Sequence, residues 1–158
     1  QGEAPDRRVR LVTTMDSRRL MVAVHEMGHA VAWHQAGLKI EAIQVRGHGS
    51  RVDGYVELER RPLTLPLQYQ NYLIGLLAGR EADHKWCDIT GQEPDDHGSS
   101  ADMQVFRRWR KHDATDTRWV THMSDKDIRT AARELVMAHW SQIVRLAEKL
   151  AQRGTVNL

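Results

Sequence analysis

Residues 20–37 of the chain read LMVAVHEMGHAVAWHQAG, a nearly continuous apolar stretch that contains an H-E-x-x-H pattern at His25, Glu26 and His29. On a helix, residues four apart share one face, so His25 and His29 can direct two imidazoles at one ion. Zinc in a catalytic site of this kind keeps one coordination position open for water. Glu26 would lie beside that water and take its proton. The stretch therefore predicts a hydrolytic zinc site on a buried helix.

A chance match is the alternative interpretation, because short patterns arise by accident and the chain contains 9 histidines. Accidental matches more often fall on polar surface helices, whereas this one has apolar flanks. Gly28 lowers helix stability by about 1 kcal/mol relative to alanine, so its place in mid-helix indicates that another element packs closely there. We expect Asp16 or Ser17 to cap the start of this helix and Gly37 to end it.

The composition limits the class of protein. The 158 residues suit one domain, expected over residues 15–158 after a polar, flexible lead-in at 1–14. A net charge of +2 gives no reason to expect a nucleic-acid partner. The single cysteine, Cys87, excludes an internal disulfide and suits a reducing, cytoplasmic location. No apolar run is long enough to form a membrane segment, and the start at Gln1 rather than Met leaves open a segment upstream.

Two short apolar segments after Gly37 predict an antiparallel β-hairpin. Residues 40–45 and 52–58 have strand character and flank a glycine-bearing loop at 47–50. A lone hairpin is marginally stable, so this one must pack on helices. Its free edge is either purely structural or a place where an extended peptide adds as a further strand. We expect His48, in the loop, to be solvated rather than a metal ligand.

Three further helices are expected. The first covers residues 67–86. In it, Gly75 and Gly79 either admit a neighbouring helix or are tolerated defects, and Arg80 and Glu81 form either a buried pair or a solvent-facing one. After a loop at 88–98, a second helix begins near Ser99. Its basic residues are interpreted as a solvated face with Trp109 turned inward, rather than as a nucleic-acid surface: Arg107, Arg108, Arg110 and Lys111. A loop at 113–123 precedes a long scaffold helix that Ser124 caps, with Asp127 at the capping-box position, and that ends near Gly154.

The third zinc ligand is the least certain part of the site from residue types alone. A catalytic zinc bound by two histidines needs one more protein ligand. Asp102 fits that role, or it stabilises the helix start in a capping box with Ser99. The longer metzincin pattern has its third histidine at the position of Gln35, so the metzincin set of three histidine ligands is excluded. Several other residues remain candidates by spacing: Asp95, Asp96, His97, Glu81 and Asp83.

The chain resembles the peptidase domain of the FtsH-type ATP-dependent zinc metalloproteases over about residues 18–157. Four blocks in order carry the resemblance: H-E-x-G-H-A-V at 25–31, Gly54-Tyr55-Val56, Ala78-Gly79-Arg80-Glu81-Ala82 and Ser100-Ala101-Asp102-Met103. The segment 143–150 followed by Thr155 is similar to the end of that domain. The resemblance implies a mainly α-helical, zincin-type fold with a small antiparallel sheet. It also implies zinc held by His25, His29 and Asp102, with Glu26 as the catalytic base.

The chain departs from that family's pattern in three ways. The ATPase module and membrane helices that normally precede the domain are absent from the 158 residues, and the loop before Asp102 is unusually acidic. Residues 79–83 read GREAD where the family usually has GRAAE. We therefore expect an ATP-independent zinc endopeptidase for unfolded or specific polypeptides, acting alone, as a homo-oligomer or with a separate ATPase partner. The alternatives are a catalytically weak zincin-fold module that binds a protein or nucleic acid, and a structural zinc, which four protein ligands usually close.

Overall fold

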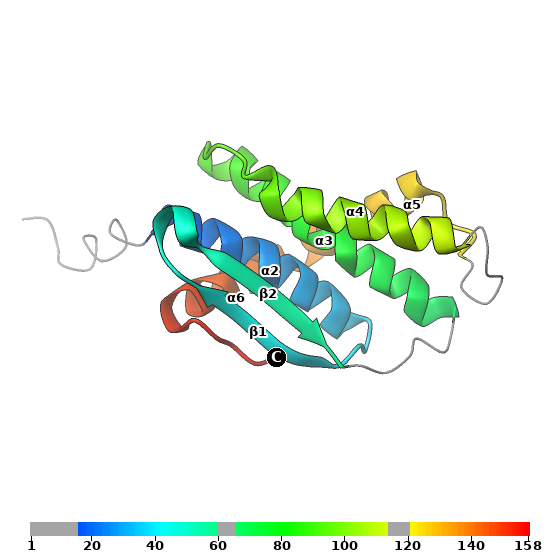
Figure 1. Cartoon of the computed structure of the whole chain (residues 1–158), viewed down its shortest axis with the longest axis horizontal. Coiled ribbons are helices and arrows are strands. Elements are labelled where there is room, and N and C mark those ends of the chain that lie inside the picture. Colours follow the sequence, from blue (N-terminus) through cyan, green and yellow to red (C-terminus); the bar gives the residue numbers. More distant parts are fainter. Residues whose placement is uncertain (1–15, 60–65, 114–120) are drawn as a thin grey trace, which may run out of the picture.

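The H-E-x-x-H stretch forms helix α2 (Ser17–Gln35), around which the other elements pack in this computed structural model (Figure 1). The structure describes residues 16–59, 66–113 and 121–158. These form, after α2, the elements β1 (Ile40–Arg46), the short 3-10 helix η1 (Gly49–Arg51), β2 (Asp53–Leu58), α3 (Pro66–Thr90), α4 (Asp96–Asp113), α5 (Asp125–Ala138) and α6 (Trp140–Arg153). The prediction of a mainly helical fold with a small antiparallel sheet is confirmed. The expected lead-in at 1–14 and most of the expected loop at 113–123 lie outside the described residues.

Both ends of α2 follow the signals in the sequence. Asp16 is the N-cap, and its Oδ1 accepts hydrogen bonds from the backbone N–H groups of Arg18 and Arg19 at 3.0 and 3.1 Å. At the other end Gly37 has a φ of +77°, a left-handed conformation that glycine adopts without strain. These caps set where the helix begins and ends, and therefore where His25 and His29 lie along it.

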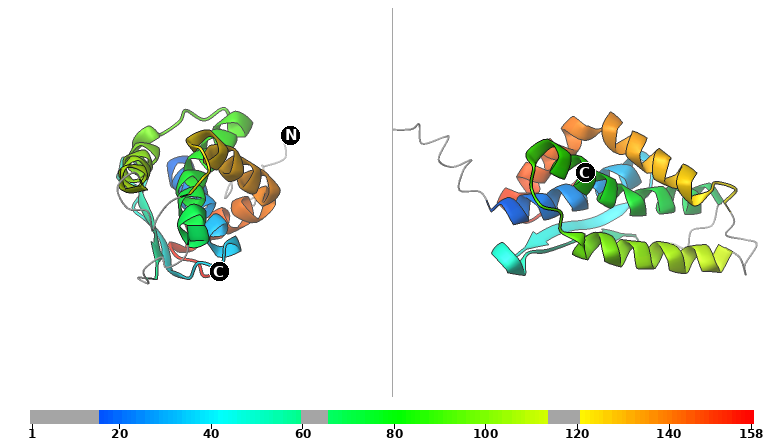
Figure 2. Two further views of the ribbon diagram at one scale, coloured as in Figure 1. Left: turned by 90° about the vertical axis from the view of Figure 1, so that its right-hand side faces the viewer. Right: turned by 90° about the horizontal axis from the view of Figure 1, so that it is seen from above.

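The elements form three layers. Helices α2 and α3 lie in the middle, with the hairpin and α4 on one side and α5 and α6 on the other (Figure 2, right). The middle pair is antiparallel, because His25 meets Asp83 of α3 whereas Trp33, further along α2, meets Tyr72. Helix α2 is consequently buried on nearly all sides, which explains why its sequence is apolar all round.

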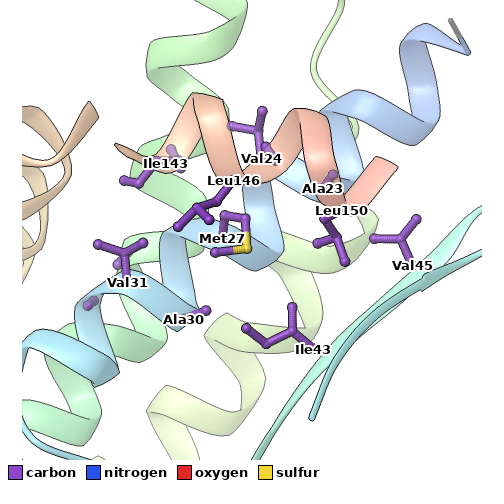
Figure 3. Packing of buried hydrophobic residues seen from close by; sticks show 14 of the residues in the cluster. Ala23, Val24, Met27, Ala30, Val31, Ile43, Val45, Ile143, Leu146 and Leu150 are labelled. Carbon is purple, nitrogen blue, oxygen red and sulfur yellow. The ribbon is translucent and has the colours of Figure 1, made fainter. Parts of the chain in front are cut away.

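The larger apolar core lies between α2, α6 and the hairpin. Figure 3 shows Met27 and Val31 of α2 facing Leu146 and Ile143 of α6, with Ile43 of β1 close by. Each of these side chains is at most 7% exposed, and burial of one such side chain stabilises the fold by about 1.5–3 kcal/mol. A second core joins α3 to α4 and α5 around several large side chains: Trp33, Tyr69, Leu73, Leu76, Leu77, Phe106 and Ile128.

Small residues bring α2 and α3 into close contact. A Cβ atom on Gly28 would lie 2.8 Å from the carbonyl oxygen of Ala78 and 2.8 Å from the Cβ of Ala82. The prediction that another element packs closely on Gly28 is therefore confirmed. This close approach lets backbone and side chains of α3 reach the two histidines of α2.

The hairpin lies along α2 and has one edge occupied. β1 and β2 pair antiparallel, with Ile43 opposite Val56 and Val45 opposite Gly54. On its other edge, β1 receives the C-terminal segment through a bridge between Gln44 and Thr155. The sheet that the described residues form has two strands in the order β1–β2, so β2 carries no strand on its outer edge.

The predicted helix boundaries are wrong in two regions of the chain. The expected single helix from Ser124 to Gly154 is two helices, because the chain turns at His139, whose φ is −111° and ψ 18°. This turn lets α5 pack on α3 while α6 packs on α2 and β1. In addition, α3 continues to Thr90 and α4 begins at Asp96, so the loop between them is shorter than the predicted 88–98. None of the described helices is both long and apolar enough to cross a membrane.

Candidate metal centre

Three potential ligand atoms meet where α2, α3 and α4 converge. The Nε2 atoms of His25 and His29 lie 3.0 Å apart, and each lies 2.9 Å from Oδ2 of Asp102. Both imidazoles are buried, whereas the Asp102 side chain is 21% exposed and marks the open side of the group. His25, His29 and Asp102 could hold a metal ion, and no further His, Cys, Asp or Glu among the described residues joins them.

A second set of contacts orients the two imidazole rings from behind. Nδ1 of His25 lies 2.7 Å from Oδ2 of Asp83, which also accepts a hydrogen bond from the Ser99 hydroxyl at 2.8 Å. Nδ1 of His29 lies 2.8 Å from the backbone carbonyl oxygen of Gly75. Carbonyl and carboxylate oxygens accept hydrogen bonds, so we infer that both Nδ1 atoms carry the proton and donate it. Partners of this kind orient metal-binding histidines in many proteins.

This assignment leaves a gap in the hydrogen bonding at the centre. Each neutral imidazole with a protonated Nδ1 presents a bare lone pair at Nε2. Two such nitrogens and one carboxylate oxygen then face one another at 2.9–3.0 Å with no donor between them. Buried acceptors in such an arrangement repel each other unless a cation lies between them. A metal ion satisfies all three atoms at once, and so the donor set fits a bound cation.

The pKa shifts of His25, His29 and Asp102 also favour a bound cation. Burial opposes a charge on His25, but the carboxylates of Asp102 and Asp83, which accept hydrogen bonds from the protonated ring, outweigh it and raise the pKa of His25 well above its usual value. Burial likewise acts to lower the pKa of His29, but Asp102 reverses that effect and raises it. Burial would raise the pKa of Asp102, yet His29 and His25 hold it well below its usual value. The group therefore attracts positive charge, whether a proton or a metal ion.

Glu26 lies beside the three ligand atoms without joining them. The residue is 8% exposed, and its carboxylate makes no hydrogen bond with any described residue and lines a recess that also reaches His25. Burial raises the pKa of Glu26, and His29 and His25 offset part of that rise. A carboxylate with a raised pKa is a better proton acceptor near neutral pH. Its position next to the ligands suits proton transfer rather than metal binding.

Glycines create the space for these side chains. A Cβ atom on Gly79 would overlap Nε2 of His29 and lie 2.9 Å from Nε2 of His25. A Cβ atom on Gly54 of β2 would lie 2.8 Å from Cγ of Glu26. Gly75 combines two roles, because a Cβ atom there would overlap the Trp33 ring and its carbonyl oxygen accepts from His29. The expectation that Gly75 and Gly79 admit a neighbouring helix is confirmed.

The structure brings together every residue predicted for the centre and separates most of the other candidates for third ligand. Asp102 lies in the second turn of α4, so the alternative that it only stabilises the helix start in a capping box is wrong. Asp83 contacts the far side of His25, Asp95 pairs with Arg18 at 2.7 Å, and Glu81 lies 3.5 Å from Arg133. The side chains of Asp96 and His97 lie outside the described part of the structure. The interpretation of His48 as solvated is confirmed, since its side chain is 82% exposed.

The remaining predictions for charged residues are also resolved. Glu81 pairs with Arg133 of α5, so the expected pairing with Arg80 is wrong. Trp109 packs against Tyr69 and Tyr72, as expected for an inward ring. The basic face of α4 is largely exposed at three positions, Arg107, Arg108 and Lys111.

Sequence reasoning missed the residues that orient the imidazoles. From the sequence, Asp83 was a candidate only for the third zinc ligand. The backbone carbonyl of Gly75 has no side-chain signal that could have indicated its role. The ring of Trp33 also stacks on His29, with 5.2 Å between centroids and planes 13° apart. The spacing of His29 and Trp33, one helical turn apart, was a signal that could have indicated this contact.

Comparison with known proteins leaves the family open. No protein-family model matches the chain, and no curated protein is significantly similar to it. The resemblance to FtsH-type peptidases thus stays an interpretation of the four sequence blocks.

Proposed function

We propose that the chain is a zinc-dependent endopeptidase that hydrolyses peptide bonds in unfolded or specific polypeptides. The observation that carries this proposal is the convergence of three lone-pair atoms with a separate carboxylate beside them. Two imidazoles and one carboxylate, all from a rigid helical framework, are a typical ligand set for catalytic zinc. Three protein ligands leave a coordination position for water, whereas a structural zinc usually has four, often cysteines.

The chemistry follows from the positions of the chain's own groups. Zinc held by His25, His29 and Asp102 would supply Lewis acidity, lowering the pKa of a water molecule toward about 7 and polarising a carbonyl oxygen. Glu26 accepts one proton from the attacking water through its carboxylate. Glu26 then returns that proton to the leaving amine nitrogen, so the carboxylate ends in its starting state. The products are a carboxyl group and an amine, and no serine or cysteine nucleophile takes part.

A polypeptide suits the surface next to the centre. Gly54 of β2 packs against Glu26, so β2, which has no further strand among the described residues on its outer edge, passes close to this carboxylate. An extended chain can add to such an edge through backbone hydrogen bonds, whatever its sequence. This arrangement supports a peptide as the substrate and favours the second interpretation of the hairpin edge.

Cleavage of an unfolded protein tests the proposal. Zinc-loaded wild-type protein should cleave reduced casein, and Glu26→Gln should keep its zinc while activity falls by about 10²–10⁴-fold, the usual contribution of a general base. Glu57→Gln is a matched control, because this exposed glutamate lies on the neighbouring strand β2. Unchanged turnover in Glu26→Gln would reject the general-base role. Zinc without cleavage in wild type would favour the binding-module alternative.

A further inference from the structure

A small recess opens beside Glu26 at the start of α2. Its apolar wall consists of Met21 and Val22 from α2 and Val52 from the segment before β2. Glu26 and His25 line its inner part, so anything held there lies next to the catalytic group. Apart from His25, Glu26 and Asp83, the residues that line the recess take no part in the metal centre or in the proton transfers described above.

An ion pair borders the same recess. Arg18 and Asp95 both line it, and a terminal guanidinium nitrogen of Arg18 lies 2.7 Å from Oδ2 of Asp95. Their side chains are 41% and 23% exposed, which places the pair at the solvent side. The pair joins the first turn of α2 to the segment before α4 and so limits the room between them.

A second observation indicates that a ligand completes this region. Nε of Arg18 is buried and has no hydrogen-bond partner among the described residues. Leaving a buried donor unsatisfied costs about 1–3 kcal/mol, which a carbonyl oxygen of a bound peptide would remove. An extended peptide on the edge of β2 would bring such carbonyl oxygens close to α2.

The size of the recess narrows what it can hold. Its volume is about 90 Å³, below the ~150 Å³ of an apolar cavity that accommodates benzene. A short aliphatic side chain therefore fits and an aromatic ring does not, and the apolar wall suits such a side chain. Four carboxylates also line the recess and oppose an acidic side chain: Glu26, Asp53, Asp83 and Asp95.

We propose that this recess binds a small aliphatic side chain of the substrate, and that Arg18, held by Asp95, is the residue that excludes larger ones. This inference rests on the proposed function and adds a substrate preference to it. A pocket discriminates side chains that differ by one methylene by about 10–200-fold. Removing the ion pair should weaken the discrimination without touching the metal ligands or Glu26.

The test uses peptides of alternating glycine and guest residue, with valine or phenylalanine as guest, so that every second position offers the same side chain. Cleavage by the zinc-loaded protein is compared for wild type, Arg18→Ala and Asp95→Ala. Asp125→Ala is the matched control, because it breaks another arginine–aspartate pair of 2.7 Å, with Arg110, outside the recess. We expect wild type and the control to prefer valine by about tenfold or more, and both recess variants to lose that preference.

Binding of the same peptides to zinc-loaded Glu26→Gln, with and without Arg18→Ala, separates this inference from the peptidase proposal. Cleavage with no preference for valine, or with the same preference in both recess variants, overturns the inference and leaves the peptidase intact. Binding that favours valine and loses this preference with Arg18→Ala, but without cleavage by wild type, supports the recess and rejects the peptidase. Absence of both binding and cleavage overturns both.

Discussion

Oδ2 of Asp83 lies 2.7 Å from Nδ1 of His25, on the side of the imidazole opposite Nε2, which faces His29 and Asp102. Asp83 therefore supports the centre, although it is not one of the three potential ligands. It holds the ring in one orientation and in the tautomer with a free lone pair at Nε2. Ser99 fixes the carboxylate in turn by donating to the same oxygen.

We predict that Asp83→Ala lowers zinc affinity by about 10–100-fold, the usual effect of removing such a partner. The affinity is measured by competition with a chelating dye. Glu81→Ala is the matched control, because it removes another buried carboxylate on α3 that contacts Arg133 instead of a ligand. Equal affinities for the two variants would contradict the orienting role of Asp83.

Removing Asp102 tests the ligand set itself. Asp102→Ala deletes the oxygen that lies 2.9 Å from both Nε2 atoms, so zinc should be lost on dialysis against buffer. The exposed variant Asp88→Ala, on α3, should retain zinc. If Asp102→Ala retained one zinc per chain, the third ligand would have to be a residue other than Asp102.

A single methyl group on α3 should close the centre. In Gly79→Ala the new Cβ would overlap Nε2 of His29, so the imidazoles must shift and we expect loss of zinc and of activity. In Gly98→Ala the Cβ would lie 3.4 Å from Nε2 of His25, an ordinary contact, and zinc should remain. Zinc content and circular dichroism of both variants check this prediction. Retention of stoichiometric zinc by folded Gly79→Ala would contradict the packing described here.

The metal-free protein should lose stability as the pH rises. A histidine whose pKa is raised by folding binds its proton more tightly in the folded state. The stabilisation from His25 is therefore complete below about pH 6.5, the unfolded value, and disappears as the pH rises through the higher folded pKa. We expect the free energy of unfolding of chelator-treated protein, from urea titrations, to fall as the pH rises above about 6.5.

Zinc should reverse that pH dependence. Binding requires neutral imidazoles and releases protons, so the zinc-loaded protein gains stability over the same range. His48→Ala should behave as wild type, because that imidazole is exposed and lies against Asp16 instead of the ligand atoms. A metal-free protein whose stability rises with pH would contradict the conclusion that His25 binds its proton more tightly in the folded state.

Much of this centre could be read from the sequence because its chemistry is local. His25, Glu26 and His29 share one helix, and helical spacing alone sets their geometry. Asp102 is 73 positions from His29, so only the zinc ligand number and the family resemblance pointed to it. The roles of Asp83 and the Gly75 carbonyl depend on how α3 crosses α2, which no local pattern encodes.

The fold was predictable to a similar extent. Caps at Asp16 and Gly37 and the hairpin at 40–58 carry local signals, and they form as expected. The break at His139 has no local signal in the sequence. Residues 125–153 contain no glycine or proline and keep an apolar stripe throughout. The turn there is imposed by packing, since α5 and α6 cover different helices.

The most direct test of the central claim is the metal content of wild-type protein, purified without chelators and measured by inductively coupled plasma mass spectrometry. The convergence of His25, His29 and Asp102 predicts one zinc per chain. A protein that holds no zinc, even after incubation with zinc and desalting, would contradict the claim that this centre binds the catalytic metal.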